Sequence, residues 1–242
     1  NHKLNDERYT PRKNIEDILE YITGEYLPTF NSTTIEMFLH KIEVLDEEYI
    51  YFNDDMFLLR EMDAAVQRIL QALEQGERIA VYGDYDVDGI TATCLLTDFL
   101  RTIGADCVYY IPGRLEEGYG LNTTAVEYLH RKQVSLIITV DCGITAVEEA
   151  KLCRSLGIDL IITDHHECKE VLPEACAIVD PHRPDATYPH LDLSGVGIAF
   201  KLASAICGEQ DLVLQRYCDF LCLGTIADVM PLRGENRVFV AR

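Results

Sequence analysis

The pattern of apolar and polar positions divides the chain into two parts. Up to residue 77, apolar residues recur at three-to-four spacing, which predicts amphipathic helices. The clearest helix covers 58–73 and is followed by Gly76, a residue typical of helix C-termini; shorter candidates cover 15–22 and 34–44. No strand pattern occurs here. We therefore expect a helical N-terminal lead-in over 1–55 and a main domain over 56–242.

From residue 78 onward, short apolar strands alternate with amphipathic helices. Unbroken Val- and Ile-rich strands in such an alternation are typical of an α/β fold, in which helices cover both faces of a parallel sheet. Right-handed crossovers then bring the carboxyl ends of all strands to one edge. The expected strands are 79–82, 107–111, 134–140, 158–163 and 177–179, and the expected helices are 90–103, 123–131, 145–156, 195–206 and 212–223.

Acids and histidines follow three of these strands directly. Strand 79–82 runs into the acidic segment 84–88, strand 134–140 ends at Asp141, and strand 158–163 ends at Asp164-His165-His166. Carboxylates that converge in one crevice repel each other unless a cation lies among them. Carboxylate oxygens with an imidazole suit Mn²⁺ or Mg²⁺. The pattern predicts a divalent-cation site at this edge of the sheet.

Each motif also has a simpler interpretation. Segment 84–89 resembles the start of a calcium loop, but the twelfth position of such a loop is a glutamate, and here it is Leu95. The same segment could be a solvated acidic turn, and Asp141 or the histidines could cap helices. The conjunction at one edge favours the cation site. Asp228 lies in an apolar stretch, where an unpaired carboxylate is costly, so we expect it to have a cationic partner.

The composition of the chain limits the classes of function that it can have. The 41 Asp and Glu outnumber the 21 Lys and Arg, for a net charge of -20, which argues against a general binder of nucleic-acid backbones. We see no secretion signal and no apolar stretch long enough for a membrane span. The nine cysteines form no CxxC pair, so we expect reduced, buried thiols and a cytoplasmic location.

Four segments together resemble the DHH phosphoesterase superfamily: DYDVDG at 84–89, VDCGIT at 140–145, DHH at 164–166 and GTIADVMPL at 224–232. Within it, segments 111–121, 194–203 and 223–237 are most similar to the RecJ family of bacterial single-strand-specific exonucleases. This resemblance covers about residues 50–242. It implies a 5′-to-3′ single-stranded-DNA exonuclease that acts in DNA repair and recombination by two-metal hydrolysis.

The resemblance also implies cofactors and residue roles. Two divalent cations are expected, with Mn²⁺ ahead of Mg²⁺. By this resemblance, Asp86 and Asp88 would each hold one metal and Asp141 would bridge the two, while His165 and Asp228 would complete the shell of the second metal with Asp88. His166 would contact the scissile phosphate, and Asp84 would orient the ligands. Arg114 and the helix start with Ser194, Gly195 and Gly197 would bind phosphate.

Several alternatives remain open at this point. Arg114 could pair with Glu116 or Glu117, and the glycines could serve close helix packing. Tyr82 stands where the inorganic pyrophosphatase branch has a histidine, which argues against that branch. The resemblance implies a fragment that lacks a Gly-rich second domain and an oligonucleotide-binding barrel, with single-stranded DNA as the partner of the full-length protein. The rivals are a small-substrate phosphoesterase, acting on oligoribonucleotides, cyclic dinucleotides or nucleotide bisphosphates, and a non-catalytic scaffold.

Overall fold

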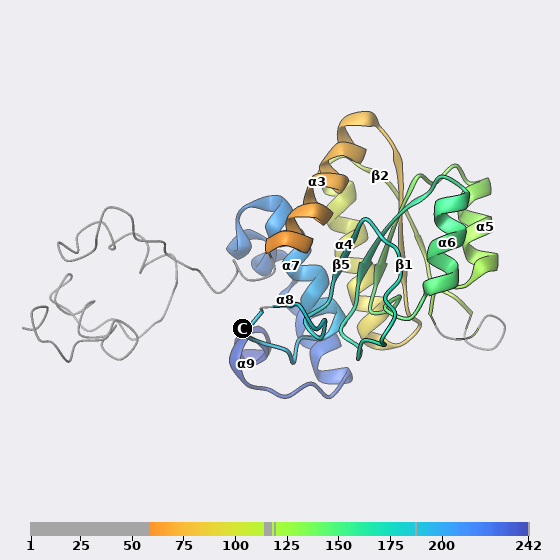
Figure 1. Cartoon of the computed structure of the whole chain (residues 1–242). Coiled ribbons are helices and arrows are strands. Elements are labelled where there is room, and N and C mark those ends of the chain that lie inside the picture. Colours follow the sequence, from red (N-terminus) through yellow and green to blue (C-terminus); the bar gives the residue numbers. More distant parts are fainter. Residues whose placement is uncertain (1–58, 114–117, 119, 187, 242) are drawn as a thin grey trace, which may run out of the picture. The chain divides into compact units, whose positions relative to one another are not determined.

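The computed structural model of the chain describes residues 59–113, 118, 120–186 and 188–241 (Figure 1). The expected lead-in over 1–55, with its helices at 15–22 and 34–44, lies outside these residues, as does the boundary at residue 55. Both stay predictions. The helix expected over 58–73 is α3 (Leu59–Gln75), and Gly76 follows it with a left-handed φ of 64°.

A five-stranded sheet forms the centre of the described region. Its strands are all parallel and lie in the order β2-β1-β3-β4-β5, which confirms the parallel sheet expected from the sequence. The strands are β1 (Arg78–Gly83), β2 (Asp106–Tyr110), β3 (Leu136–Val140), β4 (Asp159–Thr163) and β5 (Ala177–Val179).

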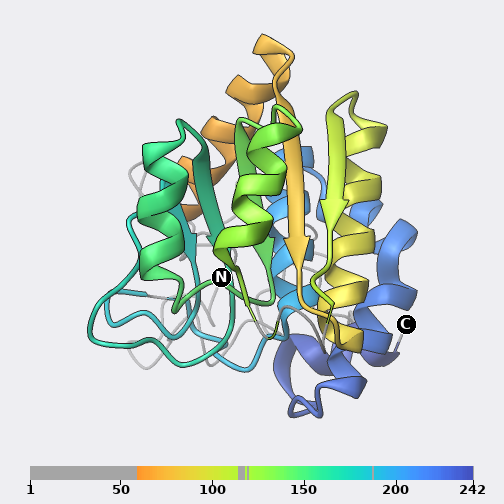
Figure 2. The ribbon, with the colours of Figure 1, turned by 90° about the vertical axis from the view of Figure 1, so that its right-hand side faces the viewer.

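Helices cover both faces of the sheet, as predicted (Figures 1 and 2). One face carries α5 (Thr123–Arg131) and α6 (Val147–Ser155). The other carries α3, α4 (Val87–Thr102) and α7 (Gly195–Cys207), with α8 (Gln210–Ala227) packed on α4 and α7. Each face buries its own apolar cluster, because alternate side chains of the inner strands point to opposite sides.

Several boundaries differ from the sequence prediction for local reasons. Helix α4 begins at Val87 instead of residue 90, because the Asp86 carboxylate accepts a hydrogen bond from the Gly89 N–H (2.9 Å) and caps it. Helix α8 continues to Ala227 instead of ending near 223. Helix α9 (Gly234–Ala241) was not predicted; it is anchored by Phe239, whose ring packs edge-on against Phe200.

All nine cysteines are free thiols, but only three of them are buried; Cys94, Cys176 and Cys207 are exposed, so the expectation of generally buried cysteines was wrong. None of the described helices has the length and apolar character that crossing a bilayer requires.

The order of the strands fixes where a ligand can bind. The chain moves from β1 outward to β2 and then returns to the other side of β1 to form β3. The crossover helices after β1 and β3 therefore leave on opposite faces, and a crevice opens between the carboxyl ends of these two strands. The acidic segment after β1 and Asp141 after β3 lie at this point.

Candidate metal centre

Asp88 is held by the start of α7. It lies in the first turn of α4 and is 1% exposed, and its carboxylate accepts hydrogen bonds from the backbone N–H groups of Gly195 (2.5 Å) and Val196 (2.9 Å). Burial raises the pKa of Asp88 to about 6, although these N–H groups and His165 oppose the rise. The positive end of α7 thus stabilises one of the buried carboxylates.

Asp141 lies at the centre of the cluster in a strained conformation. Its φ is 59°, in the left-handed region that non-glycine residues seldom adopt. It is 2% exposed, and burial, together with the charges of Asp88 and Asp86, raises its pKa to about 10. Backbone strain of this kind costs on the order of 1–3 kcal/mol and persists only where the surroundings enforce it. Here the enforced conformation aims a carboxylate into the crevice.

The His165 imidazole lies close to carboxylates from three other segments of the chain. Its Nε2 atom lies 3.0 Å from Asp141 Oδ1, 3.7 Å from Asp228 Oδ2 and 3.9 Å from Asp88 Oδ2. Potential ligand atoms fall into three groups, within each of which all atoms lie within 4.8 Å of one another: Asp84, Asp86 and Asp141; Asp88, His165 and Asp228; Asp141, His165 and His166.

Buried polar atoms that lack hydrogen bonds are a second observation that fits a cation site. Asp84 Oδ1, Asp141 Oδ1 and His165 Nε2 are buried, and none makes a well-aligned hydrogen bond with a described residue, although Asp141 Oδ1 and His165 Nε2 lie 3.0 Å apart. Buried polar atoms without partners are costly, so their clustering calls for an explanation. Burial, the largest cause, also raises the pKa values of Asp84 and Asp228. Divalent cations in the crevice would satisfy the lone pairs and offset the repulsion between the carboxylates.

Asp164, the residue that follows β4, holds His166 in place. Its Oδ1 accepts hydrogen bonds from the N–H groups of His165 (2.8 Å) and His166 (3.2 Å) and lies 2.7 Å from His166 Nδ1, while its Oδ2 accepts one from the Ile144 N–H (2.9 Å). Burial acts to raise the pKa of Asp164, but these hydrogen bonds outweigh it and lower the pKa. The hydrogen bond with Asp164 raises the pKa of His166.

Asp228 reaches the crevice from the end of α8. The residue caps that helix and is followed by Val229 at a left-handed φ of 56°. The helix passes close to the site because Gly224 has no side chain: a Cβ there would lie 2.6 Å from Asp88 Oδ1 and 2.5 Å from Thr91 Oγ1. The sequence predicts a cationic partner for Asp228, and the structure places the His165 imidazole beside it.

The structure does not show the residues expected to bind substrate in that role. Arg114 lies outside the described residues. The Gly195 N–H is bound to Asp88, and the Gly197 N–H is bound to Ser194 Oγ (3.4 Å). Gly195 also allows close packing, since a Cβ there would lie 2.5 Å from Asp141 Cβ. Phosphate binding by this helix start therefore stays a prediction, and the structure shows its donors holding a carboxylate and a hydroxyl instead.

The sequence analysis gives no role to two residues that shape the site, and it leaves out an acid that lies near it. Asp164 was noted in its motif but was given no role, and Gly224 was read only as part of a motif. Asp180, just after β5, is 1% exposed, and burial raises its pKa to about 7. Its position after a strand at the same sheet edge was a signal that could have placed it near the other acids.

The fold and the cluster define a class: an open, parallel α/β protein with a group of carboxylates and histidines suited to a divalent cation at its switch point. The family model described as "DHH family, N-terminal domain" matches residues 78–225, and the chain belongs to this family. It is similar to the single-stranded-DNA-specific exonuclease RecJ of Bacillus subtilis, at 48% identity over 184 residues, which is 76% of this chain and 23% of that protein. RecJ of Escherichia coli is 38% identical over 190 residues, 73% of this chain and 33% of that protein.

Solved structures of RecJ exonucleases are also similar to this chain. The crystal structure of exonuclease RecJ bound to manganese matches with a TM-score of 0.68 at 39% identity, over 76% of this chain and 47% of that one. RecJ of Thermus thermophilus in complex with Mn²⁺ matches with a TM-score of 0.63 at 35% identity, over 75% of this chain and 26% of that one. The chain thus spans about a quarter to a third of the curated relatives. A model of Stealth protein CR2 also matches residues 7–72, too small a share to show a family.

Proposed function

We propose that this chain carries the hydrolytic site of a metal-dependent phosphodiesterase, a 5′-to-3′ single-stranded-DNA exonuclease of RecJ type that acts in DNA repair and recombination. The observation that carries the proposal is the convergence of ligand atoms from four separate segments within 4.8 Å of one another in each group. Relatives with this domain are RecJ exonucleases, and two solved ones hold manganese.

The residues divide into two proposed cation positions. Asp86 lies on one side, with Asp84 beside it; Asp88, His165 and Asp228 lie on the other, and Asp141 takes part in groups on both sides. Mn²⁺, or Mg²⁺ in its place, would supply Lewis-acid activation of water and charge neutralisation at the phosphate. Asp84 belongs to a ligand group and also keeps a free buried oxygen, so it is placed to bind directly as well as to orient its neighbours.

The protein's own groups position the reactants. The imidazole of His166 is 46% exposed and is oriented by Asp164, so it faces the open side of the crevice and can donate to a phosphate oxygen. The helix start at Gly195 fixes Asp88, and the strained backbone fixes Asp141. Arg114 stays our candidate for binding the phosphate from the loop after β2.

Single-stranded DNA is the proposed substrate and partner of the full-length protein. The support is the naming of the relatives, whose remaining length would supply most of the surface that grips a strand. The chain's net charge of -20 gives this domain alone little affinity for a phosphate backbone. We also infer a cytoplasmic location, which agrees with nine free thiols.

The test uses the full-length protein with Mn²⁺ and single-stranded DNA labelled at its 5′ end. We expect early release of labelled short products, and no product from the Asp141→Ala variant. Cleavage of dinucleotides with long strands left intact would favour the small-substrate alternative. Wild-type turnover by Asp141→Ala would contradict the assignment of the site.

A further inference from the structure

The two edge strands of the sheet differ in how far side chains cover their outer backbone groups. At the β5 edge, the backbone of Ile178 is closed off by side chains: its N–H donates to Glu61 Oε2 (3.1 Å), and its carbonyl accepts from Arg183 Nη1 (2.8 Å). Arg183 and Glu61 also pair with each other at 3.1 Å. This pair blocks the backbone groups through which an edge strand would recruit another chain.

The closure at the β2 edge is smaller: of the described side chains, that of Arg101 binds one backbone carbonyl of this strand. In the described part of the chain, no strand pairs with the outer side of β2, and Tyr109 is 60% exposed. Arg101 of α4 donates its Nε to the carbonyl of Cys107 (2.9 Å), and its two terminal nitrogens have no partner among the described residues. An exposed edge of this kind presents backbone donors and acceptors to an incoming strand.

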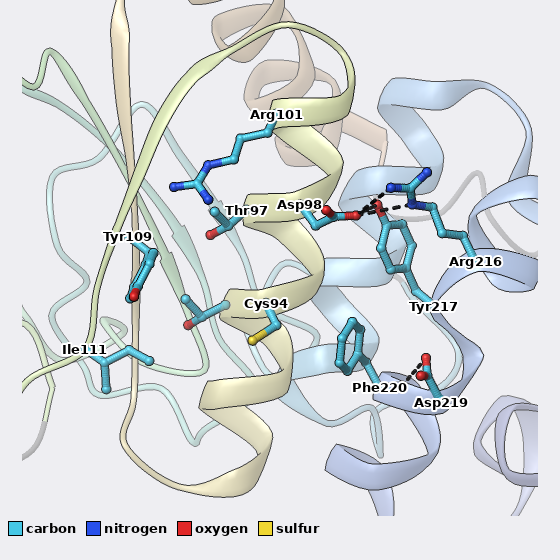
Figure 3. Close-up of a pocket in the computed structure, with 11 residues that line it drawn as sticks. Cys94, Thr97, Asp98, Arg101, Tyr109, Ile111, Arg216, Tyr217, Asp219 and Phe220 are labelled. Carbon is cyan, nitrogen blue, oxygen red and sulfur yellow. Dashed lines mark hydrogen bonds and ion pairs between the residues drawn. The ribbon is translucent and has the colours of Figure 1, made fainter.

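A groove of about 710 Å³ runs along this edge (Figure 3). Tyr109 and Ile111 form one wall, Cys94 and Thr97 of α4 form the floor, and Phe220 of α8 lies on the opposite side. Thr97 is 5% exposed, and its hydroxyl has no hydrogen-bond partner among the described residues. The groove therefore combines apolar side chains with one unsatisfied buried hydroxyl, and it is also lined by the charged residues Asp98, Arg101, Arg216 and Asp219.

A second hollow, of about 350 Å³, shares Arg101 and Tyr109 with the groove. Its other lining residues include Val108 of β2 and residues of α5. Val108 packs with the cluster on the α5 side, whereas Cys107 belongs to the cluster on the α4 side. The groove thus lies on the α4 side of the edge strand, and the smaller hollow extends from the same strand toward α5.

From this arrangement we propose that β2 is a docking site for an extended segment of a partner protein, which adds to the sheet as a sixth strand. Side chains of a strand alternate between its two faces. Those on one face of the added strand would enter the groove over α4, and those on the other would reach the smaller hollow. Main-chain pairing with pockets for alternate side chains is an established mode of peptide recognition.

The chemistry of the two hollows defines the partner segment. The groove, walled by Ile111, Tyr109 and Phe220, suits aromatic or large aliphatic side chains. The smaller hollow is lined by three basic side chains, Arg78, Arg101 and Lys132; because Arg78 is paired with Asp106 of β2 at 2.8 Å, Arg101 and Lys132 are the two that offer charge to a carboxylate. The occupant is an extended segment in which apolar residues alternate with acidic ones.

Two other occupants fit less well. Nucleic acid would meet Asp98 and Asp219 in the groove, and Arg216 is already paired with Asp98 at 2.9 Å. A second copy of this chain would bring together two molecules that each carry a formal net charge of -20.

The probe is a short fluorescent peptide in which phenylalanine or valine alternates with glutamate, and the control peptide has the same composition in blocked order. Fluorescence polarisation with the 242-residue chain should show saturable binding of the first peptide and at least about tenfold weaker binding of the second. Arg101→Glu should weaken binding by about tenfold or more. Arg131→Glu, the same charge change at an exposed arginine of α5 outside both linings, should change it by less than about twofold.

Hydrogen exchange locates the bound peptide. We expect slower amide exchange in 106–110 and no change in 177–179, and the same pattern, at higher peptide concentration, for a Lys132→Glu variant. No saturable binding, equal binding by Arg101→Glu, or protection elsewhere would overturn the proposal. Protection of 106–110 by oligothymidylate, or by dimerisation without peptide, would assign the edge to nucleic acid or to a second copy and overturn it as well.

Discussion

The steric role of Gly195 gives a sharp test of the metal centre. A Cβ at this position would lie 2.5 Å from Asp141 Cβ and 2.7 Å from Asp141 Oδ1. Favourable contacts between such atoms begin at roughly 3.5 Å, so a methyl group forces Asp141 or the start of α7 to move by about 1 Å. The same movement disturbs Asp88, whose carboxylate is bound by the Gly195 N–H.

The expected result of Gly195→Ala is weaker cation binding in a folded protein. Residues that orient ligands typically change metal affinity by about 10- to 100-fold when they are altered. Isothermal titration of the 242-residue chain with Mn²⁺ should show a loss in that range, while circular dichroism stays that of the wild type. Alanine otherwise favours a helix by up to about 1 kcal/mol over glycine, so a loss cannot come from helix propensity.

Gly197→Ala is the matched control on the same helix turn. A Cβ there meets Leu193 Cδ2 at 3.4 Å, which is an ordinary contact. This variant should bind Mn²⁺ within about twofold of the wild type and should unfold at a slightly higher temperature. A folded Gly195→Ala protein with wild-type Mn²⁺ affinity would refute the reasoning, because the cluster would then not depend on the position of Asp141.

Three further predictions concern stability. Val229 is 85% exposed at a φ of 56°, so Val229→Gly should relieve backbone strain and stabilise the fold by about 1 kcal/mol in thermal unfolding; an unchanged or lower midpoint would argue against strain at this residue. Burial raises the pKa of Asp180 to about 7, so its contribution to stability is present below the unfolded pKa and is lost as pH rises through 7. The stability of Asp180→Asn relative to the wild type should therefore rise by roughly 2–3 kcal/mol from about pH 5 to pH 8 in urea unfolding, and a constant difference would contradict this. Mn²⁺ at about 100 times its dissociation constant should stabilise the chelator-treated protein by about 2.7 kcal/mol for each cation bound, with a smaller effect of Ca²⁺; equal effects would count against a site of this geometry.

Much of the fold could be predicted from the sequence because the strands have a strong, unbroken apolar pattern. Segments such as 136–140 are buried at every position, and only a parallel sheet covered on both faces buries a strand in this way. The strand order was not readable. It depends on the return of β3 to the far side of β1, and residue patterns alone do not specify which neighbour a buried strand selects.

The site was predictable as a set of residues but not as a geometry. Asp141 and His165 follow buried strands, and that position alone placed them at one edge. The contacts of Asp88 with α7 could not be foreseen, because they join residues 107 positions apart in the chain. The end of α8 was misjudged because Gly224 resembles a helix terminator, whereas the structure places it inside the helix, where only a glycine fits against Asp88.

The most direct test of the account is an anomalous-scattering map of crystals grown from this chain and soaked in Mn²⁺. We expect two peaks in the crevice between the ends of β1 and β3, one beside Asp86 and one beside His165, with Asp141 contacting both. An empty crevice at saturating Mn²⁺, or peaks that these side chains do not contact, would contradict the assignment of a two-cation centre.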